Sequence, residues 1–252
     1  TDRLKGSISV KGLKIDDLTL KNYKETLSEN SESVTLFKPS STKGGYFSNF
    51  GWIKATKEEN YDLPNDQTIW NTDAKKITNN NPITFYWING QGIRFEQEII
   101  IDENYMFKIK QKVFNNTDKN INLNPVAKIS RTDTPKTQGF FILHEGPIGI
   151  IDNVLEEIDY KDLKKNIGPL EYNTKGGWFG ITDKYWLASI IPNQTSNVIA
   201  RYQFYSKNNK EKYQVDFKGS KLEIAPNQST TINNLLYAGA KEVKLLDKYE
   251  EK

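Results

Sequence analysis

Apolar and polar side chains alternate with a period of two along most of this chain. The segment 93–101 shows the pattern clearly, with Ile93 and Ile99 on one face and Glu96 and Glu98 on the other. Such alternation is typical of a β-strand with one face in a hydrophobic core and one in water. Repeated between Asn, Asp, Gly and Pro residues, it predicts about eighteen short strands, the pattern of a sandwich or barrel.

Short turn sequences predict how neighbouring strands pair. Asn89-Gly90 separates an aromatic run at 84–88 from the strand at 93–101, and Asn-Gly between such runs is the strongest local signal of a β-hairpin. Asp152-Asn153 should also turn the chain, and an opening hairpin should turn at Asp16-Asp17. Among the other strands, we expect some at residues 34–37, 46–52, 67–70, 140–145, 148–151 and 154–158.

The stretch 176–192 is the longest nearly uncharged part of the chain and holds two of its five tryptophans. It predicts a strand, a tight turn at 182–184 and a second strand, both buried on both faces. The other three tryptophans stand beside predicted turns, so we expect them to be more exposed than the central pair. The three are Trp52, Trp70 and Trp87, and the central pair is Trp178 and Trp186.

Two segments depart from strand periodicity. Asp159 is a candidate N-cap for a helical turn that runs to Lys165, with acids first and lysines last, as the helix dipole prefers. Residues 241–252 fit a short amphipathic helix. We expect this helix to pack Val243, Leu246 and Tyr249 against the sheet.

Composition excludes several classes of protein. With 36% hydrophobic and 27% charged residues, the 252-residue chain can fill a large core and present an ordinary polar surface. The net charge of +3 rests mainly on lysine, and only four arginines are present, so a nucleic acid is not a favoured partner. The absence of cysteine excludes disulfides and thiol chemistry. No run approaches the roughly 18 apolar residues that span a bilayer, and no signal peptide is recognisable at the start.

Catalytic and metal-binding groups are scarce. His144-Glu145 is the only place where an imidazole and a carboxylate are adjacent, but neighbouring residues of a strand point to opposite faces and cannot converge on one atom. A structural histidine beside the Gly146-Pro147 turn is the better interpretation. One histidine and no cysteine also disfavour a metal site, and no nucleotide or phosphate motif is present. We therefore predict no catalytic residues, no metal and no cofactor.

Several short sequence motifs occur in the same order as in one known protein family. They are Gly6-Ser7-Ile8, the run from Ile15 to Tyr23, Gly51-Trp52, Leu63-Pro64 with Trp70, Arg131 to Pro135, Leu143 to Gly149, Gly176 to Pro192, and Tyr237 to Val243 with Leu245-Leu246-Asp247. Through them the chain resembles, over essentially its whole length, the large periplasmic domain of the YidC family of bacterial membrane protein insertases. No single motif is diagnostic, and the resemblance rests on the order of all of them.

This resemblance implies a fold and a role. It implies a large twisted antiparallel β-sandwich, a supersandwich similar to galactose mutarotases, with one or two short helices. Residues 1–240 would form the sandwich, and residues 241–252 a helix leading toward a transmembrane segment outside this chain. The domain would be non-enzymatic and lie on the periplasmic side of the inner membrane. It would associate with the Sec translocon components SecDF and SecYEG and with nascent membrane protein segments.

Two groups of residues are then candidates for contact. The segment 139–165 places an acidic arm close to a lysine pair on loops, and its candidate partner-binding residues are Glu156, Glu157, Asp162, Lys164 and Lys165. The C-terminal helix would be membrane-proximal and would connect rigidly to the following segment. Its apolar residues are Val243, Leu245, Leu246 and Tyr249.

Two other functions stay open from the sequence. A carbohydrate-binding or sugar-epimerising sandwich would need a groove with several aromatic side chains and at least two convergent acid or base groups. The thirty aromatic residues could supply such a groove, although most aromatic residues in a sheet protein fill the core. The third possibility is a structural spacer without a ligand.

Overall fold

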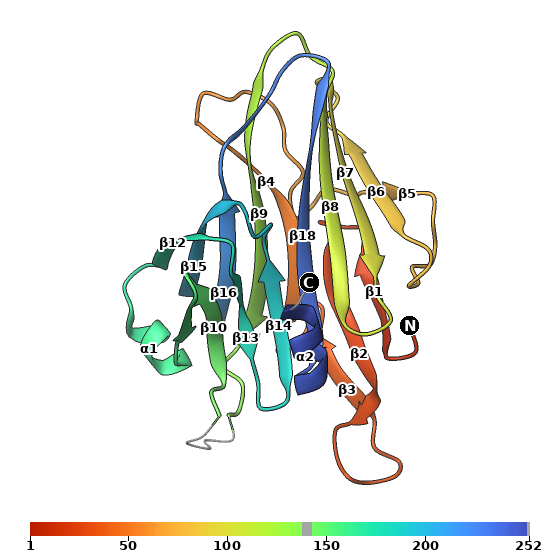
Figure 1. Ribbon diagram of the computed structural model, residues 1–252, viewed down its shortest axis with the longest axis vertical. Coiled ribbons are helices and arrows are strands. Elements are labelled where there is room, and N and C mark those ends of the chain that lie inside the picture. Colours follow the sequence, from red (N-terminus) through yellow and green to blue (C-terminus); the bar gives the residue numbers. More distant parts are fainter. Residues whose placement is uncertain (138–142, 251–252) are drawn as a thin grey trace.

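The computed structural model describes residues 1–137 and 143–250 as a sandwich of two antiparallel β-sheets with two short helices on its surface (Figure 1). Within these residues each sheet has nine strands. The first sheet has the order β1-β2-β4-β9-β16-β15-β12, with β3 beside β2 and β17 beside β9. Its strands are β1 (Leu4–Ser9), β2 (Lys14–Lys24), β3 (Ser33–Phe37), β4 (Tyr46–Lys54), β9 (Ile121–Thr132), β12 (Leu170–Lys175), β15 (Asn197–Lys207), β16 (Lys210–Gly219) and β17 (Leu222–Ile224).

The second sheet has the order β11-β10-β13-β14-β18-β8-β7-β6-β5. Its strands are β5 (Asn71–Thr72), β6 (Ile83–Ile88), β7 (Ile93–Ile101), β8 (Met106–Asn115), β10 (Gly146–Ile151), β11 (Val154–Glu157), β13 (Trp178–Thr182), β14 (Trp186–Ile191) and β18 (Gln228–Ala240). Helix α1 (Tyr160–Lys165) follows β11, and α2 (Val243–Glu250) follows β18. The predicted all-β antiparallel sandwich with two short helices is confirmed.

Turn chemistry accounts for the tight hairpins. The β10–β11 turn has positive φ at both central residues, 47° at Asp152 and 65° at Asn153. The β15–β16 turn repeats this at Asn208 and Asn209, with φ of 53° and 56°. Asn and Asp tolerate this left-handed region better than other non-glycine residues, and two such residues make the turn that matches strand twist. The hairpin of β6 and β7 around Asn89-Gly90 also forms as predicted.

The hydrophobic core lies between the two sheets, on the faces that we term inner. In β7, Ile93, Phe95 and Ile99 are buried on this face, as their alternation predicts. Aromatic rings from the two sheets meet across the interface, and Phe179 of β13 lies 6.2 Å from Phe217 of β16 between ring centroids. The sheets are held together chiefly by burial of this apolar surface.

Buried amides also bridge the two sheets. The Gln97 side chain of β7 donates a 2.8 Å hydrogen bond to the Phe50 carbonyl of β4, and Gln111 of β8 donates one of 2.9 Å to the Gly51 carbonyl. The Gln111 amide oxygen in turn accepts a 2.9 Å bond from Asn234 of β18. These polar groups lie inside an otherwise apolar layer, so their pairing avoids the cost of burying unsatisfied amides.

The expected exposure is wrong for two tryptophans, Trp52 and Trp70, whereas Trp87 is partly exposed. Trp52 and Trp70 are each only 4% exposed, whereas Trp178 and Trp186 of the central strands are partly exposed. Trp52 lies on the inner face of β4, and alternation in β13 puts Phe179 inside and Trp178 on the outer face. Proximity to a turn therefore did not predict exposure, because the face of the strand decides it.

The opening hairpin turns earlier than predicted. Strand β2 runs through Asp16-Asp17 without a turn, and its pairing with β1 shifts register there, between Ser7 and Ile8. The chain instead reverses near Gly12 and Leu13, which have positive φ values of 72° and 45°. Asp16 is accommodated as an irregularity in the ladder, so two adjacent acids were not sufficient evidence of a turn.

Two predicted strands are also corrected. Residues 67–70 form no strand, because Ile69 makes only an isolated bridge to Lys11, and the strand nearby is β5. Of the predicted strand 140–145, residues 140–142 lie outside the described residues, and residues 143–145 are irregular. Residues 143–145 therefore form no strand, and among the described residues the ladder begins at Gly146 in β10.

The buried amide bridge generates a stability prediction. Replacing Gln111 by Leu leaves the Gly51 carbonyl and the Asn234 amide without this partner, and should lower the free energy of unfolding by about 2 kcal/mol. Urea denaturation measures it. Gln203→Leu is the matched control, because Gln203 is partly exposed on the outer face, and we expect a change below about 0.5 kcal/mol. Equal effects for the two variants would contradict a structural role for the bridge.

Candidate functional site

The predicted partner-binding residues lie on strand β11, at one edge of the second sheet, and on helix α1, which contacts β15 of the first sheet. β11 pairs only with β10, so its other edge has no strand beside it among the described residues. Glu157, Asp162, Lys164 and Lys165 are exposed and Glu156 is partly exposed. Glu156 and Glu157 are consecutive in the strand and point to opposite faces of the sheet. We call these five accessible residues of β11 and α1 the β11–α1 surface.

The charges on this surface pair differently from the expected arrangement. Lys165 forms an ion pair with Asp162 at 3.0 Å, one helical turn away. Lys164 instead pairs with Glu211 of β16, and this hydrogen bond holds the pKa of the Glu211 carboxyl below its ordinary value. No ion pair joins Glu156 or Glu157 to either lysine in the part of the chain that the structure describes. The two glutamates therefore present acidic groups that the lysines do not neutralise.

Helix α1 is anchored by a buried cluster that the sequence did not single out. Tyr160 and Leu163 are the buried residues of the helix, and Asp159 occupies the N-cap position without a side-chain cap bond. The Arg131 guanidinium of β9 forms a 2.6 Å ion pair with Asp183, donates a 3.3 Å hydrogen bond to the Tyr160 hydroxyl and lies over the Tyr46 ring. The helix and its charged face therefore have a fixed position on the sandwich.

His144 serves the connection to α1 rather than catalysis. Its Nε2 lies 2.9 Å from the Pro147 carbonyl, and its Nδ1 lies 3.9 Å from the Asp159 carboxylate. Glu145 accepts a 3.3 Å hydrogen bond from the Lys184 main chain instead. The two adjacent side chains have different partners and do not converge on a shared space.

The C-terminal helix is tied to the beginning of the chain by Glu242. Its carboxylate accepts hydrogen bonds from Arg3 at 2.6 Å, from Tyr23 at 2.9 Å and from Tyr105 at 3.2 Å. Burial alone would raise the pKa of Glu242, but the bonds from Arg3 and Tyr23 hold it below its ordinary value. Gly239 contributes space, because a Cβ there would overlap the Tyr105 ring. We call these groups the Glu242 cluster.

Helix α2 covers part of the outer face of the second sheet (Figure 1). Leu245 is 8% exposed, the Tyr249 ring meets Tyr237 edge-on with centroids 6.0 Å apart, and the Tyr249 hydroxyl bonds to Asp102. Val243 is 71% exposed, so its predicted packing is wrong. It opens the helix directly after Glu242, whose inward contacts set the rotation of the first turn. Leu245 and Tyr249 consequently define the buried face, with Leu246 partly buried.

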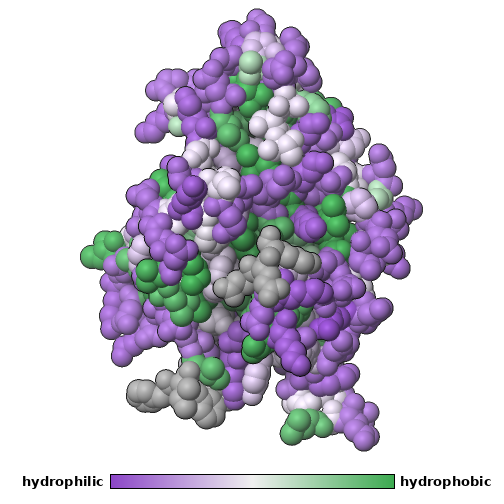
Figure 2. Space-filling model, viewed as in Figure 1, coloured by the Kyte–Doolittle hydropathy of each residue, from purple (hydrophilic) through white to green (hydrophobic). Residues whose placement is uncertain are grey.

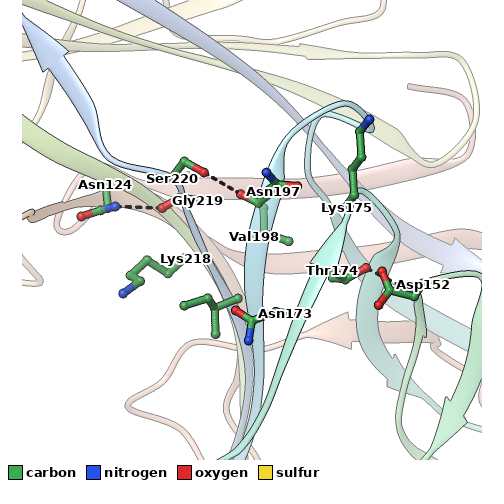
Figure 3. A pocket seen from close by; sticks show the side chains of 11 residues that line it. Asn124, Asp152, Asn173, Thr174, Lys175, Asn197, Val198, Lys218, Gly219 and Ser220 are labelled. Atoms are coloured by element: carbon green, nitrogen blue, oxygen red, sulfur yellow. Dashed lines mark hydrogen bonds between the residues drawn. The ribbon is translucent and has the colours of Figure 1, made fainter.

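A cavity of about 620 Å³ lies along β12, β15 and β16 and reaches the β10–β11 turn (Figure 3). Its rim is held by a 2.9 Å bond from the Asn124 side chain to the Gly219 carbonyl and a 3.1 Å bond from Ser220 to the Asn197 carbonyl. The lining is rich in amides and also contains two lysines and one aspartate. It comprises Asn124, Asp152, Asn173, Thr174, Lys175, Asn197, Val198, Ile199, Lys218, Gly219 and Ser220.

Sequence reasoning missed the Glu242 cluster, the Arg131 anchor and the cavity for one reason. Arg3 and Glu242 are 239 positions apart, and Arg131 and Asp183 are 52 apart. No local pattern connects such residues. The scarcity of arginine was the one available signal, because two of the four arginines anchor these clusters.

The described residues contain no group of three or more His, Cys, Asp or Glu side chains that could hold a metal ion. Among the same residues, no helix has the length and apolarity needed to cross a membrane.

Solved structures with this fold show what the architecture is similar to. A galactose mutarotase related enzyme from Lactobacillus acidophilus superposes with a TM-score of 0.58 at 10% identity, covering 94% of this chain and 95% of that one. A galactose mutarotase-like protein from Lactobacillus casei gives 0.61 at 8% identity, covering 94% and 98%. At such identities the likeness shows the supersandwich fold alone. It lends no support to sugar epimerisation by this chain.

Sequence relatives show the family. The proteins named membrane protein insertase YidC from Rickettsia bellii and Rickettsia felis are 43% and 42% identical over 251 residues, which is all of this chain and 44% of each relative. The chain thus spans less than half the length of these relatives. They are named for membrane protein insertion, which agrees with the predicted non-enzymatic role. The family model described as YidC periplasmic domain matches residues 1–252, and the chain belongs to this family.

Proposed function

We propose that this domain is a non-enzymatic binding module that holds partners of a membrane insertase on the periplasmic side of the inner membrane. The partners are the Sec translocon components SecDF and SecYEG and segments of nascent membrane proteins. The observation that carries the proposal is the β11–α1 surface, which combines exposed charge with a rigid anchor and lacks convergent catalytic groups. Surfaces of this kind favour recognition over chemistry.

Charge and rigidity support this surface as the partner contact. Glu156 and Glu157 are accessible at the sheet edge, and the exposed Asp162 of α1 forms its one ion pair among the described residues with Lys165 on the same helix. Arg131 and Tyr160 fix the helix beneath them. A partner with complementary basic groups would therefore meet a preformed acidic surface and lose little conformational entropy from this side.

We further propose that residues 241–252 form a stiff connection between the sandwich and a transmembrane segment. The Glu242 cluster and the Tyr249–Asp102 bond support this, because they hold α2 at both ends. Leu245 adds apolar burial between them. A helix fastened in this way would fix the orientation of residues 1–240 relative to the membrane.

The acidic surface can be tested by charge reversal. Changing Glu156, Glu157 and Asp162 together to lysine should reduce co-purification of SecDF with the parent insertase at least tenfold, because opposed charges become like charges. Reversal of Glu29, Glu32 and Glu103, which are exposed elsewhere, is the matched control and should leave recovery unchanged. Undiminished SecDF recovery by the first variant would remove the β11–α1 surface from the proposal.

The stiff connection predicts a stability change. Leu245→Ser combined with Leu246→Ser should lower the free energy of unfolding by about 3 kcal/mol, because a buried and a half-buried leucine lose their apolar contacts. Val243→Ser on the same helix is the control, since Val243 is 71% exposed, and should cost less than about 0.5 kcal/mol. Denaturant unfolding measures both. A melting curve unchanged by the double substitution would mean that α2 is a loose tether.

The Glu242 cluster predicts a dependence on pH. The folded-state pKa of Glu242 is depressed, so its contribution is present above the unfolded value of about 4.3 and is lost as pH falls through the lower folded value. Glu242→Gln should therefore cost about 2 kcal/mol at pH 7. The difference from the parent chain should shrink below about pH 4. Urea unfolding at pH 7 and pH 3.5 measures it, and a constant difference would contradict the assignment.

A further inference from the structure

Apolar side chains form a row across the outer face of the second sheet. The row follows the register from strand to strand. Leu155 of β11 pairs with Ile150 of β10, and Ile150 pairs with Trp178 of β13. Phe179 of β13 pairs with Ile190 of β14, and the next position of this antiparallel ladder sets Trp178 opposite Ile191. Ile191 in turn pairs with Leu235 of β18. We call the five residues the apolar strip: Leu155, Ile150, Trp178, Ile191 and Leu235.

The strip is accessible and departs from the pattern of the rest of this face. Leu155 is 51% exposed, and the other members are partly exposed. On β7 and β8 the outer positions instead carry charge, and Glu98 and Lys110 form a 3.7 Å ion pair there. Figure 2 shows hydrophobic surface over β10 on the face that also bears α2. An outer face that is apolar on these strands and charged on the neighbouring ones points to a binding surface.

The dimensions of the strip match a short helix. Four steps between neighbouring strands, at about 4.8 Å each, give a length of about 19 Å. A helix rises about 1.5 Å per residue, so about 13 residues would cover the strip. One apolar stripe along such a helix would match a row that is one side chain wide.

Two observations select a helix as the occupant. Strands β10, β13, β14 and β18 each have neighbours on both sides, so an added strand could pair only along the free edge of β11 and would not lie across the strip. The occupant must therefore satisfy its own backbone hydrogen bonds, as a helix does. Helix α2 already packs on this outer face, where its Tyr249 covers Tyr237, two residues along β18 from Leu235. The strip thus continues an existing helix-on-sheet interface.

The charges at the two ends complement a helix of one direction. Glu157 lies beside Leu155 at the β11 end, and Lys108 of β8 pairs with Leu235 at the other. The partial positive charge of a helix N-terminus favours a carboxylate nearby, and the C-terminus favours an ammonium group. We propose that the apolar strip binds an amphipathic helix of another polypeptide, lying across the strands with its N-terminus at β11. This binding deepens the partner-binding function proposed above but uses a different surface.

Titration of a defined peptide tests the proposal. The probe is a fluorescein-labelled amphipathic peptide of about 14 residues with one leucine stripe and Ser, Gln and Ala elsewhere, compared with a scrambled peptide of equal composition. Fluorescence anisotropy measures its binding to the 252-residue chain. The strip variant carries Ile150→Ser and Leu155→Ser, and a second variant carries only Trp178→Ser. The control carries Ile69→Ser and Ile88→Ser, which are 57% and 52% exposed away from the strip.

We expect the native chain to bind the amphipathic peptide and not the scrambled one, and both strip variants to bind at least tenfold more weakly than the control. A lysine pair added at the peptide's N-terminus should strengthen binding more than the same pair at its C-terminus, because Glu157 lies at that end. Equal binding of the scrambled peptide, unchanged binding by both strip variants, or equal losses in the control would each overturn the proposal.

Further measurements distinguish helix binding at the strip from dimerisation of this chain and from partner binding at the β11–α1 surface. Sedimentation of the chain alone should show a monomer, and a dimer that the strip variant abolishes would assign the strip to a second copy instead. The Asp162→Lys change should leave peptide binding within about threefold, since the residue lies outside the strip. The strip variant should still recover SecDF. Loss of SecDF recovery in the Asp162→Lys variant with intact peptide binding would therefore implicate the β11–α1 surface alone.

Discussion

Burial of the inner faces of two broad sheets is the constraint on which the rest of this structure depends. Each strand must give its alternate side chains to the core, so its other side chains are left for the outer face. Phe179 inside and Trp178 outside illustrate the division along one strand. The hydrophobic contribution is large and non-directional, while the amides of Gln97 and Gln111 add directional bonds between the sheets. The outer faces can consequently differ in chemistry without loss of the fold.

Two arginine ion pairs hold the helices of this domain in place. Arg131 joins the turn after β13 to helix α1, and Arg3 joins the first strand to the segment before α2. Removing Asp183 would leave the Arg131 side chain, which is only 15% exposed, without its partner, and this costs more than the pair contributes. Both helices are short, and neither would be stable alone in water. Their positions therefore depend on these arginines, and so do the surfaces that they carry.

The outer surface has three regions of distinct chemistry. The β11–α1 surface carries three carboxylates and two lysines, the cavity beside β12 has three asparagines among its lining residues, and the strip beside α2 is apolar. None of them assembles an acid and a base around a common point, and this agrees with a family named for membrane protein insertion. Separate regions of this kind would suit the proposed role of holding several partners, because each region offers a different chemistry for recognition.

Local pattern determined most of the fold. Alternation predicted the strands, Asn-Gly and Asp-Asn predicted hairpins, and ordered motifs predicted the family, because each of these depends on neighbouring residues. Tertiary structure alone decided which face of a strand is buried and which distant residues meet. It exposed Val243, placed Trp52 inside and brought Arg3 to Glu242. The apolar strip comes from five strands that adjoin only after register is set, and register depends on long-range pairing that no short segment encodes.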